Sequence, residues 1–285
     1  MSQLTEMSVI KRAAETLKRA DYVLITAGAG LGVDSGLPDF RGVEGFWRAY
    51  PPMKQLNLRF EEMSTPRWFK EDPQLAWGFF GHRQNLYKTK DPHDGYHILK
   101  RIVDSKGPDS YFIHTSNVDG HFERCHGSIQ HLQCTKRCDG IWGVQDHHEQ
   151  KFPINVDPVT FRAQGELPKC PTCDALCRPN VLMFSDSYWN TEREEEQEAF
   201  RSEWLDKVLQ QCKQGKKMAI IEIGAGKYVP TIRYLSENMA RTTKGTLIRI
   251  NVRESEMDRI ESDSNISISL GGLEALTLIE KELFE

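Results

Sequence analysis

Three glycines follow a short apolar run near the start of the chain. The run 23–26 is rich in β-branched residues and predicts a strand buried on both faces. The turn that follows contains Gly28, Gly30 and Gly32. Glycine lets a backbone approach a ligand closely, and successive amides at a strand-to-helix turn can hold phosphate. The turn therefore indicates a nucleotide-binding loop, with a glycine turn that binds nothing as the alternative.

The loop after this turn carries three chemically different groups. Asp39, Phe40 and Arg41 supply a carboxylate, an aromatic ring and a fixed cation. The glycine spacing is not the complete dinucleotide fingerprint, and no acidic residue ends a second strand about 20 residues later. A dehydrogenase needs that acid for the ribose of its cofactor. These features disfavour a dehydrogenase.

A second polar group follows the next predicted strand, over 110–115. Ser116, Asn117 and Asp119 come directly after it. In open α/β sheets, ligands bind at the carboxyl ends of the strands. We therefore expect these side chains to lie at a ligand site.

Four of the seven cysteines form two close pairs. Cys134 and Cys138 are separated by three residues, and Cys170 and Cys173 by two. Such pairs present four thiolates to one tetrahedral zinc ion, and a closed site of this kind is structural rather than catalytic. Three histidines lie nearby as alternative ligands: His131, His147 and His148. Because four thiolates suffice, we expect one structural zinc per chain.

The stretch 22–42 resembles the signature of the sirtuins, the NAD-consuming protein deacylases. That signature reads Gly-Ala-Gly, a serine, and then Ser-Gly-Ile-Pro-Asp-Phe-Arg-Gly; here Gly32 replaces the serine and Leu37 the isoleucine. The sirtuin Thr-Gln-Asn-Ile-Asp-Gly is similar to 115–120, with Ser116 for the glutamine. The triplet 126–128 resembles the catalytic histidine motif, and 251–254 resembles the sirtuin Asn-x-Glu turn.

The resemblance implies that NAD is consumed as a co-substrate and that an acyl-lysine protein or peptide is the partner. His126 is then the general base, with Asn117 and Asp119 completing the catalytic group. The implied cofactor-binding residues are Gly28, Ala29, Gly30, Asp39, Phe40, Arg41, Ser116, Asn117, Asp119, Gly224, Ala225, Asn251 and Glu254. The metal ligands are Cys134, Cys138, Cys170 and Cys173.

Several departures from the family pattern affect the expected site. Only eight residues separate Asn117 from His126, and nine extended steps span about 30 Å at most. Either the histidine arrives by a tighter path than usual, or a deletion harms the site. Gly224-Ala225-Gly226 stands where sirtuins have Gly-Thr-Ser, and 185–189 replaces the Gly-Glu that follows their peptide-binding strand.

Helical and strand patterns alternate along the chain. Helices are predicted near 9–20, 94–104, 191–213 and 272–283, and strands near 22–26, 110–115, 217–223 and 246–251. This order predicts an α/β fold with a Rossmann-like, doubly wound parallel sheet. We also expect 45–52 to be an aromatic loop that its two prolines end, and the apolar strand 177–184 to rejoin the main sheet.

The resemblance implies one sirtuin-type catalytic domain over 1–285 with two lobes. The large Rossmann-like lobe comprises about 1–45, 92–130 and 178–285. The small lobe comprises a helical part at about 46–91 and a zinc ribbon at about 131–177.

Composition limits the remaining function classes. The 285 residues are 39% hydrophobic and 27% charged, as in soluble globular proteins. The net charge is −4, which gives no reason to expect nucleic-acid or anionic-membrane binding. No run of 18 or more apolar residues predicts a membrane span, and no secretory signal is recognisable. A cytoplasmic or nuclear location is the expectation, and the oligomeric state stays open.

Three functions compete with deacylation on the same residues. The site could transfer ADP-ribose to a protein or hydrolyse NAD. A segment 117–126 too short to complete the site would leave an inert NAD-binding module.

Overall fold

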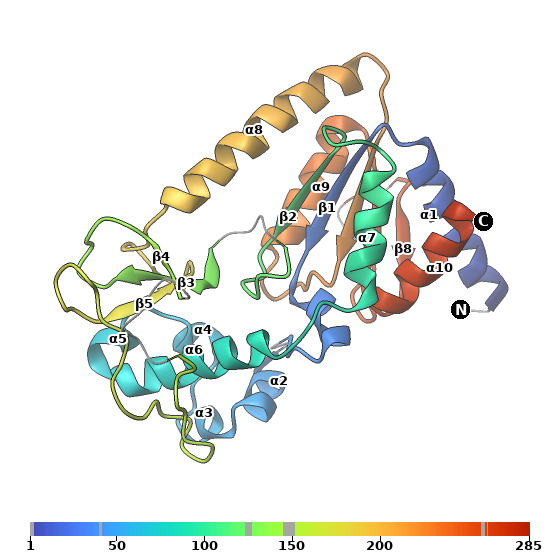
Figure 1. Ribbon diagram of the computed structural model, residues 1–285. Helices are drawn as coiled ribbons and strands as arrows, with labels where there is room; N and C mark the ends of the chain where they lie inside the picture. The colour runs from blue at the N-terminus through green and yellow to red at the C-terminus, as the bar shows by residue number, and fades with distance from the viewer. Residues whose placement is uncertain (1–2, 40–41, 123–126, 145–151, 258–259, 261) are drawn as a thin grey trace. The chain divides into compact units, whose positions relative to one another are not determined.

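The computed structural model describes residues 3–39, 42–122, 127–144, 152–257, 260 and 262–285 (Figure 1). The chain divides into two compact units. The first comprises Met1–Asp39, Pro92–Asn117 and Glu198–Glu285, and the second Phe40–Asp91 and Val118–Gln197.

The first unit is built on a five-stranded sheet. Its strands are β1 (Tyr22–Ala27), β2 (Tyr111–Thr115), β6 (Met218–Ile223), β7 (Thr246–Ile250) and β8 (Ile266–Ile268). They lie in the order β2-β1-β6-β7-β8, and all neighbours pair in parallel. The chain adds β2 on one side of β1 and later strands on the other, so the order reverses between β1 and β6. The predicted doubly wound parallel sheet is confirmed.

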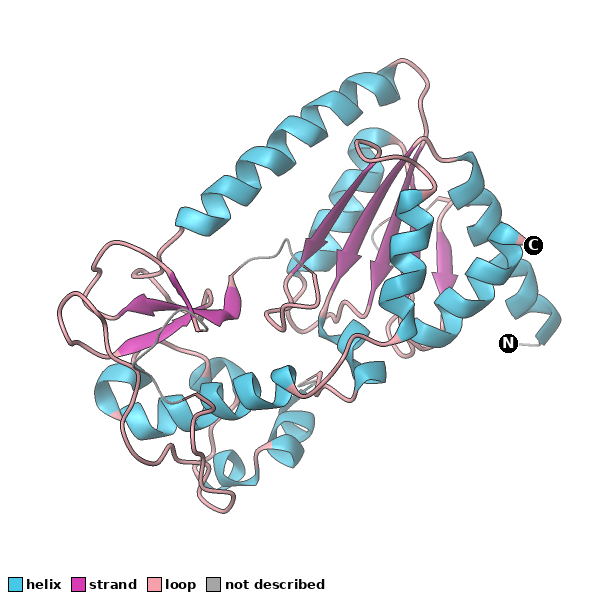
Figure 2. Ribbon diagram, viewed as in Figure 1, coloured by secondary structure: helices cyan, strands magenta, loops and turns pink. Residues whose placement is uncertain are grey.

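Helices cover both faces of this sheet (Figures 1 and 2). They are α1 (Gln3–Arg19), the 3-10 helix η1 (Ala29–Ser35), α7 (Asp94–Asp104), α9 (Thr231–Thr243) and α10 (Gly272–Phe284). Helices α1, α7 and α10 pack together on one face, and α9 packs on β6 and β7 from the other. Trp204 of α8 (Glu192–Lys213) packs against the core that α9 shares with the sheet.

The second unit combines short helices with a small sheet. The helices are α2 (Gly42–Ala49), α3 (Pro51–Gln55), α4 (Phe60–Met63), α5 (Trp68–Glu71) and α6 (Pro73–Lys88). The antiparallel sheet has the order β4 (Trp142–Gly143), β3 (Ser128–Cys134) and β5 (Cys177–Asn180). The indole of Trp77 in α6 donates a hydrogen bond of 2.9 Å to the carbonyl oxygen of Cys177. Helix α6 therefore supports the zinc-ribbon sheet directly.

Aromatic side chains form the core of the second unit. Phe46, Tyr50, Trp77, Phe79 and Phe80 are all fully buried. The expectation of an aromatic loop over 45–52 was wrong, because α2 and α3 cover this stretch. The two prolines open α3 instead of ending a loop, since proline is compatible with the first turn of a helix.

The strand expected to rejoin the main sheet was also placed wrongly. Cys177–Asn180 forms β5, which pairs antiparallel with β3 in the small sheet. Correspondingly, 118–130 and 178–197 group with the second unit, whereas the sequence assigned them to the large lobe. Among the described residues, no helix has the length and apolarity needed to cross a membrane.

Candidate functional site

The loops after β1 and β6 contact each other at the carboxyl edge of the five-stranded sheet. The Gly28 amide donates to the Ile223 carbonyl at 2.9 Å, and the Gly30 amide to the Gly224 carbonyl at 3.0 Å. A Cβ on Gly28 would lie 2.8 Å from the Gly224 oxygen. Gly224 itself has a φ of +65°, and a Cβ there would lie 2.3 Å from the Leu31 nitrogen. Both Gly28 and Gly224 must therefore be glycine.

The three residues predicted to hold phosphate differ in accessibility. Gly28 is buried, Gly30 is half-buried and Ala29 is exposed. Because the amides of Gly28 and Gly30 already donate to the β6 loop, Ala29 is the member of this set that is open to a ligand. The phosphate role of the set stays a prediction.

Asn117 lies buried at the end of β2 and is tied to the glycine loop. Its side-chain amide donates to the Gly28 carbonyl oxygen at 3.1 Å. Its backbone amide donates to the Thr115 hydroxyl at 3.0 Å, and that hydroxyl donates to the Ala27 carbonyl at 2.9 Å. The side chain of Ser116 is exposed beside it. These bonds fix the orientation of Asn117 beside the glycine loop that follows β1.

The loop after β7 completes this edge. The Asn251 side-chain nitrogen donates to the Ala225 carbonyl at 2.9 Å, and its Oδ1 accepts the amides of Arg253 and Glu254 at 3.1 Å each. The Glu254 carboxylate accepts the Lys227 amide at 2.8 Å. Predicted cofactor residues that follow four separate strands, β1, β2, β6 and β7, are thus brought together within the first unit.

A buried ionic network lies beneath these loops. Arg249 on β7 is directly opposite Glu222 on β6 and donates to it at 2.5 and 3.1 Å. It also donates to Glu237 of α9 at 2.9 Å. Burial by itself lowers the pKa of Arg249, but the bonds to both carboxylates more than offset this and raise it. The guanidinium therefore stays charged within the core.

The remaining predicted site residues are not all in the described part of the chain. Phe40, Arg41 and His126 lie outside it. Asp39 is half-buried at the end of the first segment of unit one. Asp119 belongs to the second unit, where its Oδ1 accepts the His121 amide at 2.9 Å. The catalytic roles of these residues stay predictions.

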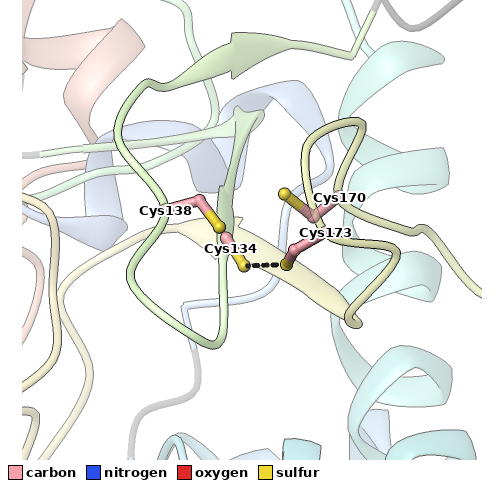
Figure 3. Close-up of side chains that lie close together, drawn as sticks. All are labelled: Cys134, Cys138, Cys170 and Cys173. Atoms are coloured by element: carbon pink, nitrogen blue, oxygen red, sulfur yellow. Dashed lines mark hydrogen bonds between the residues drawn. The ribbon is translucent and has the colours of Figure 1, made fainter.

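Four cysteines of the second unit converge (Figure 3). They are Cys134, Cys138, Cys170 and Cys173, and their Sγ atoms all lie within 4.8 Å of one another. A tetrahedral zinc ion with bonds of about 2.3 Å holds its sulfurs about 3.8 Å apart. Cys134 and Cys173 already have their sulfurs 3.6 Å apart. The geometry and the donor set fit a closed, structural zinc site.

The thiols of this cluster influence one another. The hydrogen bond with Cys173 is the main reason that the pKa of Cys138 is raised, to about 12. The Lys136 amide donates to the sulfur of Cys134 at 3.2 Å. Zinc binds thiolates, so loading this site releases protons. The fifth cysteine of this region, Cys177, is opposite Cys134 in the β3–β5 register, and burial raises the pKa of its thiol.

The segment after β5 is held to the small sheet by a second buried ion pair. Arg178 donates to Asp186 at 2.7 and 3.0 Å, and both side chains are at most 2% exposed. Asp186 also accepts the Tyr188 amide at 3.1 Å, and the Arg137 guanidinium lies 3.7 Å from the Tyr188 ring centre. Asp186 therefore fastens the stretch that departs from the sirtuin Gly-Glu.

A comparison of the sequence with protein-family models identifies the family of the chain. The family model described as "Sir2 family" matches residues 28–204, which is more than half of the chain. The chain belongs to the Sir2 family. The match includes the glycine loop, Asn117 and all four zinc-site cysteines, and it confirms the resemblance to sirtuins.

Curated Sir2-type relatives match most of the chain. A protein of Thermococcus kodakarensis, named an NAD-dependent protein deacylase, is 30% identical over 256 residues, covering 87% of this chain and 86% of that protein. A protein of Pyrococcus abyssi with the same name is 29% identical over 260 residues, covering 88% and 90%.

Solved Sir2 structures share the fold. A Sir2 homologue in complex with NAD has a TM-score of 0.61 at 20% identity, covering 95% of this chain and 92% of that chain. A Sir2 homologue in complex with ADP-ribose has a TM-score of 0.64 at 21% identity, covering 99% and 96%.

Sequence reasoning missed the buried charges of this Sir2-family chain. Glu222 and Arg249 each interrupt an otherwise apolar strand, and one charge in each of two neighbouring buried strands was the available signal for a cross-strand pair. No comparable local signal indicated Arg233 or the pair of Arg178 with Asp186.

Proposed function

We propose that this Sir2-family chain is an NAD-dependent protein lysine deacylase that releases nicotinamide and O-acyl-ADP-ribose. The observation that carries the proposal is the meeting of Gly28, Asn117, Ala225 and Asn251 at the carboxyl edge of the parallel sheet. This edge is where open α/β sheets bind ligands. The name shared by the curated relatives supports the same activity.

The loops of the first unit fit a dinucleotide. Gly28 and Gly224 leave no room for a side chain where the two loops meet, so backbone forms this surface. Asn117 and Asn251 supply fixed amide groups on either side of that contact. When bound, NAD would supply the ribose carbon with which the acyl oxygen of the modified lysine forms a bond as the bond to nicotinamide breaks.

Different residues of the chain orient the ligand, exclude water and remove a proton. Asn117 and Asp119 orient the ribose and nicotinamide, and Asp39, Phe40 and Arg41 organise the cleavage site and exclude water. His126 removes the proton from a ribose hydroxyl, because imidazole titrates near neutral pH. The four-cysteine cluster holds zinc as a structural element, with no open position for chemistry.

The segment 181–184 is suited to bind an extended peptide. Val181 and Met183 are buried, whereas Leu182 and Phe184 are exposed. Burial alternates along these residues, which follow the end of β5 at Asn180 and lead into a turn at Phe184. Strand addition there would give affinity for an acyl-lysine peptide through main-chain hydrogen bonds. A solved Sir2 structure that shares the fold contains a deacetylated peptide and 3′-O-acetyl-ADP-ribose.

Nicotinamide release with and without an acetyl-lysine peptide tests the function. We expect release that depends on the peptide, with O-acetyl-ADP-ribose identified by mass spectrometry. ADP-ribosylated protein would establish a transferase instead, and free ADP-ribose without peptide a hydrolase. NAD binding by calorimetry with no nicotinamide release would reject catalysis.

A further inference from the structure

Arg233 of α9 is a buried cation whose hydrogen bonds go to backbone carbonyls. Its side chain is 5% exposed. One terminal nitrogen donates to Glu254 at 2.7 Å and to Ala225 at 3.4 Å, and the other donates to Glu256 at 2.9 Å. All three acceptors are main-chain oxygens. One side chain thus spans the loop after β6 and the loop after β7.

A guanidinium at this depth requires compensation. Burial lowers the pKa of Arg233, and the neighbouring cation Arg249 lowers it further. The carboxylates of Glu222, Glu237 and Glu254 act in the opposite direction. Each of these groups lies on β6, β7, α9 or the loop that follows β7. An aliphatic side chain would fill the same volume without this cost, so the charge has another use.

The loops after β6 and β7, which Arg233 connects, are also joined to each other by side-chain hydrogen bonds. The Ala225 carbonyl accepts from both Arg233 and Asn251. Glu254, whose carbonyl accepts from Arg233, has its carboxylate on the Lys227 amide. Loss of Arg233 would leave the Glu254 carbonyl without its charged donor, whereas the Glu256 carbonyl would keep the bond from Arg249 at 2.8 Å. Among the described residues, the bonds of Asn251 and Glu254 and the exposed pair of Lys227 with Glu256 at 4.0 Å would then still connect the two loops.

We propose that Arg233 is a positioning residue for dinucleotide binding: from beneath, it holds the loops after β6 and β7 in the arrangement that receives NAD. It does so without touching the cofactor. This inference rests on the proposed NAD-dependent function. It assigns to α9 a part in binding affinity, separate from the chemical step at His126.

Two substitutions of Arg233 and one control test this role. R233M keeps an unbranched apolar stem and removes every donor, whereas R233K keeps the charge and one donor group. M239A is the control, because Met239 lies on the same helix, is 4% exposed and belongs to the core that α9 shares with the sheet. M239A destabilises α9 without removing any loop hydrogen bond.

We expect R233M to raise the dissociation constant and the KM for NAD about tenfold or more, with a smaller rise in R233K. The kcat at saturating NAD should stay within about twofold of the wild-type value, because Arg233 does not contact the reacting atoms. M239A should bind NAD like the wild type despite a lower melting temperature. Equal NAD affinity in R233M and M239A would overturn the role of Arg233 and would leave the proposed deacylase function standing.

Hydrogen exchange in the chain without NAD provides a second readout. The amides of Lys227, Arg253 and Glu254 are donors within these loops. They should exchange faster in R233M than in M239A, and unchanged exchange would overturn the role. A wild-type chain that binds no NAD would overturn the proposed function, and the role of Arg233 in NAD binding with it.

Discussion

The side-chain amide of Asn117 donates a hydrogen bond of 3.1 Å to the main-chain carbonyl of Gly28. This bond joins the end of β2 to the glycine loop after β1. The sequence predicted a nucleotide-binding loop at the second position and a ligand-binding group of polar side chains at the first. Because the amide nitrogen is committed to the fold, the orientation of the whole Asn117 side chain is set before any ligand arrives. Such preorganisation is what a positioning residue requires.

Replacing Asn117 should separate the two loops. N117A removes one hydrogen bond and should lower the free energy of unfolding by about 1 kcal/mol. N117D should cost more, because a carboxylate cannot donate and would face the Gly28 oxygen. Both should lose most nicotinamide release. Urea unfolding and the release assay measure these effects, with S116A, whose side chain is exposed, as the stability control. Equal stability of N117A and N117D would contradict the account.

Much of the first unit could be predicted from local pattern. The runs that became β1 and β6 were recognisable because central parallel strands are buried on both faces and read as continuous apolar sequence. The four cysteines were recognisable because zinc fixes both the donor type and the spacing. Asn117 was found because it follows a strand, which is a topological rule rather than a packing detail.

Other features depend on partners that are distant in sequence. Cys177–Asn180 is only four residues long, and nothing within it shows that β3 rather than the main sheet is its partner. Phe46 and Tyr50 were read as loop aromatics, although they are buried on and beside α2 against Phe79. Arg233 reaches the Glu256 carbonyl, 23 residues away, and its helical position gives no indication of that bond.

Substituting His126 tests the chemical step. H126A should bind NAD with near wild-type affinity and lose deacylation, because the imidazole is the general base and general base catalysis contributes about 10²- to 10⁴-fold. Calorimetry with NAD and turnover of an acetyl-lysine peptide measure the two properties separately. H121A is the matched histidine control in the second unit and should keep turnover. Retained turnover in H126A would reject the assignment.

Removing the metal should unfold the second unit. The four sulfurs lie within 4.8 Å of one another, as one zinc ion would hold them, so a strong chelator should release one zinc per chain and abolish the near-ultraviolet circular dichroism of this aromatic-rich unit. C138S should bind zinc more weakly, whereas C212S, outside the cluster, should not. Elemental analysis of the purified protein gives the stoichiometry, and a chain without zinc would refute the site.

Breaking the buried pair of Arg178 and Asp186 should be costly. D186A leaves a guanidinium that is 2% exposed without its partner, which should lower the free energy of unfolding by about 3–5 kcal/mol. The double variant R178M/D186L should lose less, because no unpaired charge remains buried. K100A, which breaks an exposed pair, should cost less than about 1 kcal/mol. Urea titrations compare the variants, and additive single-variant losses would contradict the coupling.

The same substitution should weaken peptide binding. Asp186 follows the exposed Leu182 and Phe184 and fixes the direction in which the chain leaves them. D186A should therefore raise the KM for an acyl-lysine peptide more than the KM for NAD. Steady-state kinetics at varied peptide and varied NAD separate the two constants, and equal rises in both would assign Asp186 to stability alone.

Asp72 should make stability depend on pH in the acid range. It caps α6 through the Leu75 amide and accepts from Arg162 at 2.8 and 2.6 Å. The bond from Arg162 is the main reason that the pKa of Asp72 lies below its usual 3.8. Because the folded-state pKa is lowered, the stabilisation is complete above about pH 4 and disappears as the pH falls through the lowered value.

The comparison of wild type with D72N isolates this effect. At pH 7, D72N should be less stable by about 0.5–1 kcal/mol, because asparagine still caps α6 but loses the ionic bond to Arg162. The difference should shrink below about pH 4, when the wild-type carboxylate is protonated and resembles the amide. Protonation of the zinc thiolates affects both proteins equally and cancels in the difference. E71Q, at the exposed neighbour Glu71, controls for net charge, and a gap between wild type and D72N that stays constant down to pH 3 would show that Asp72 stabilises α6 without its charge.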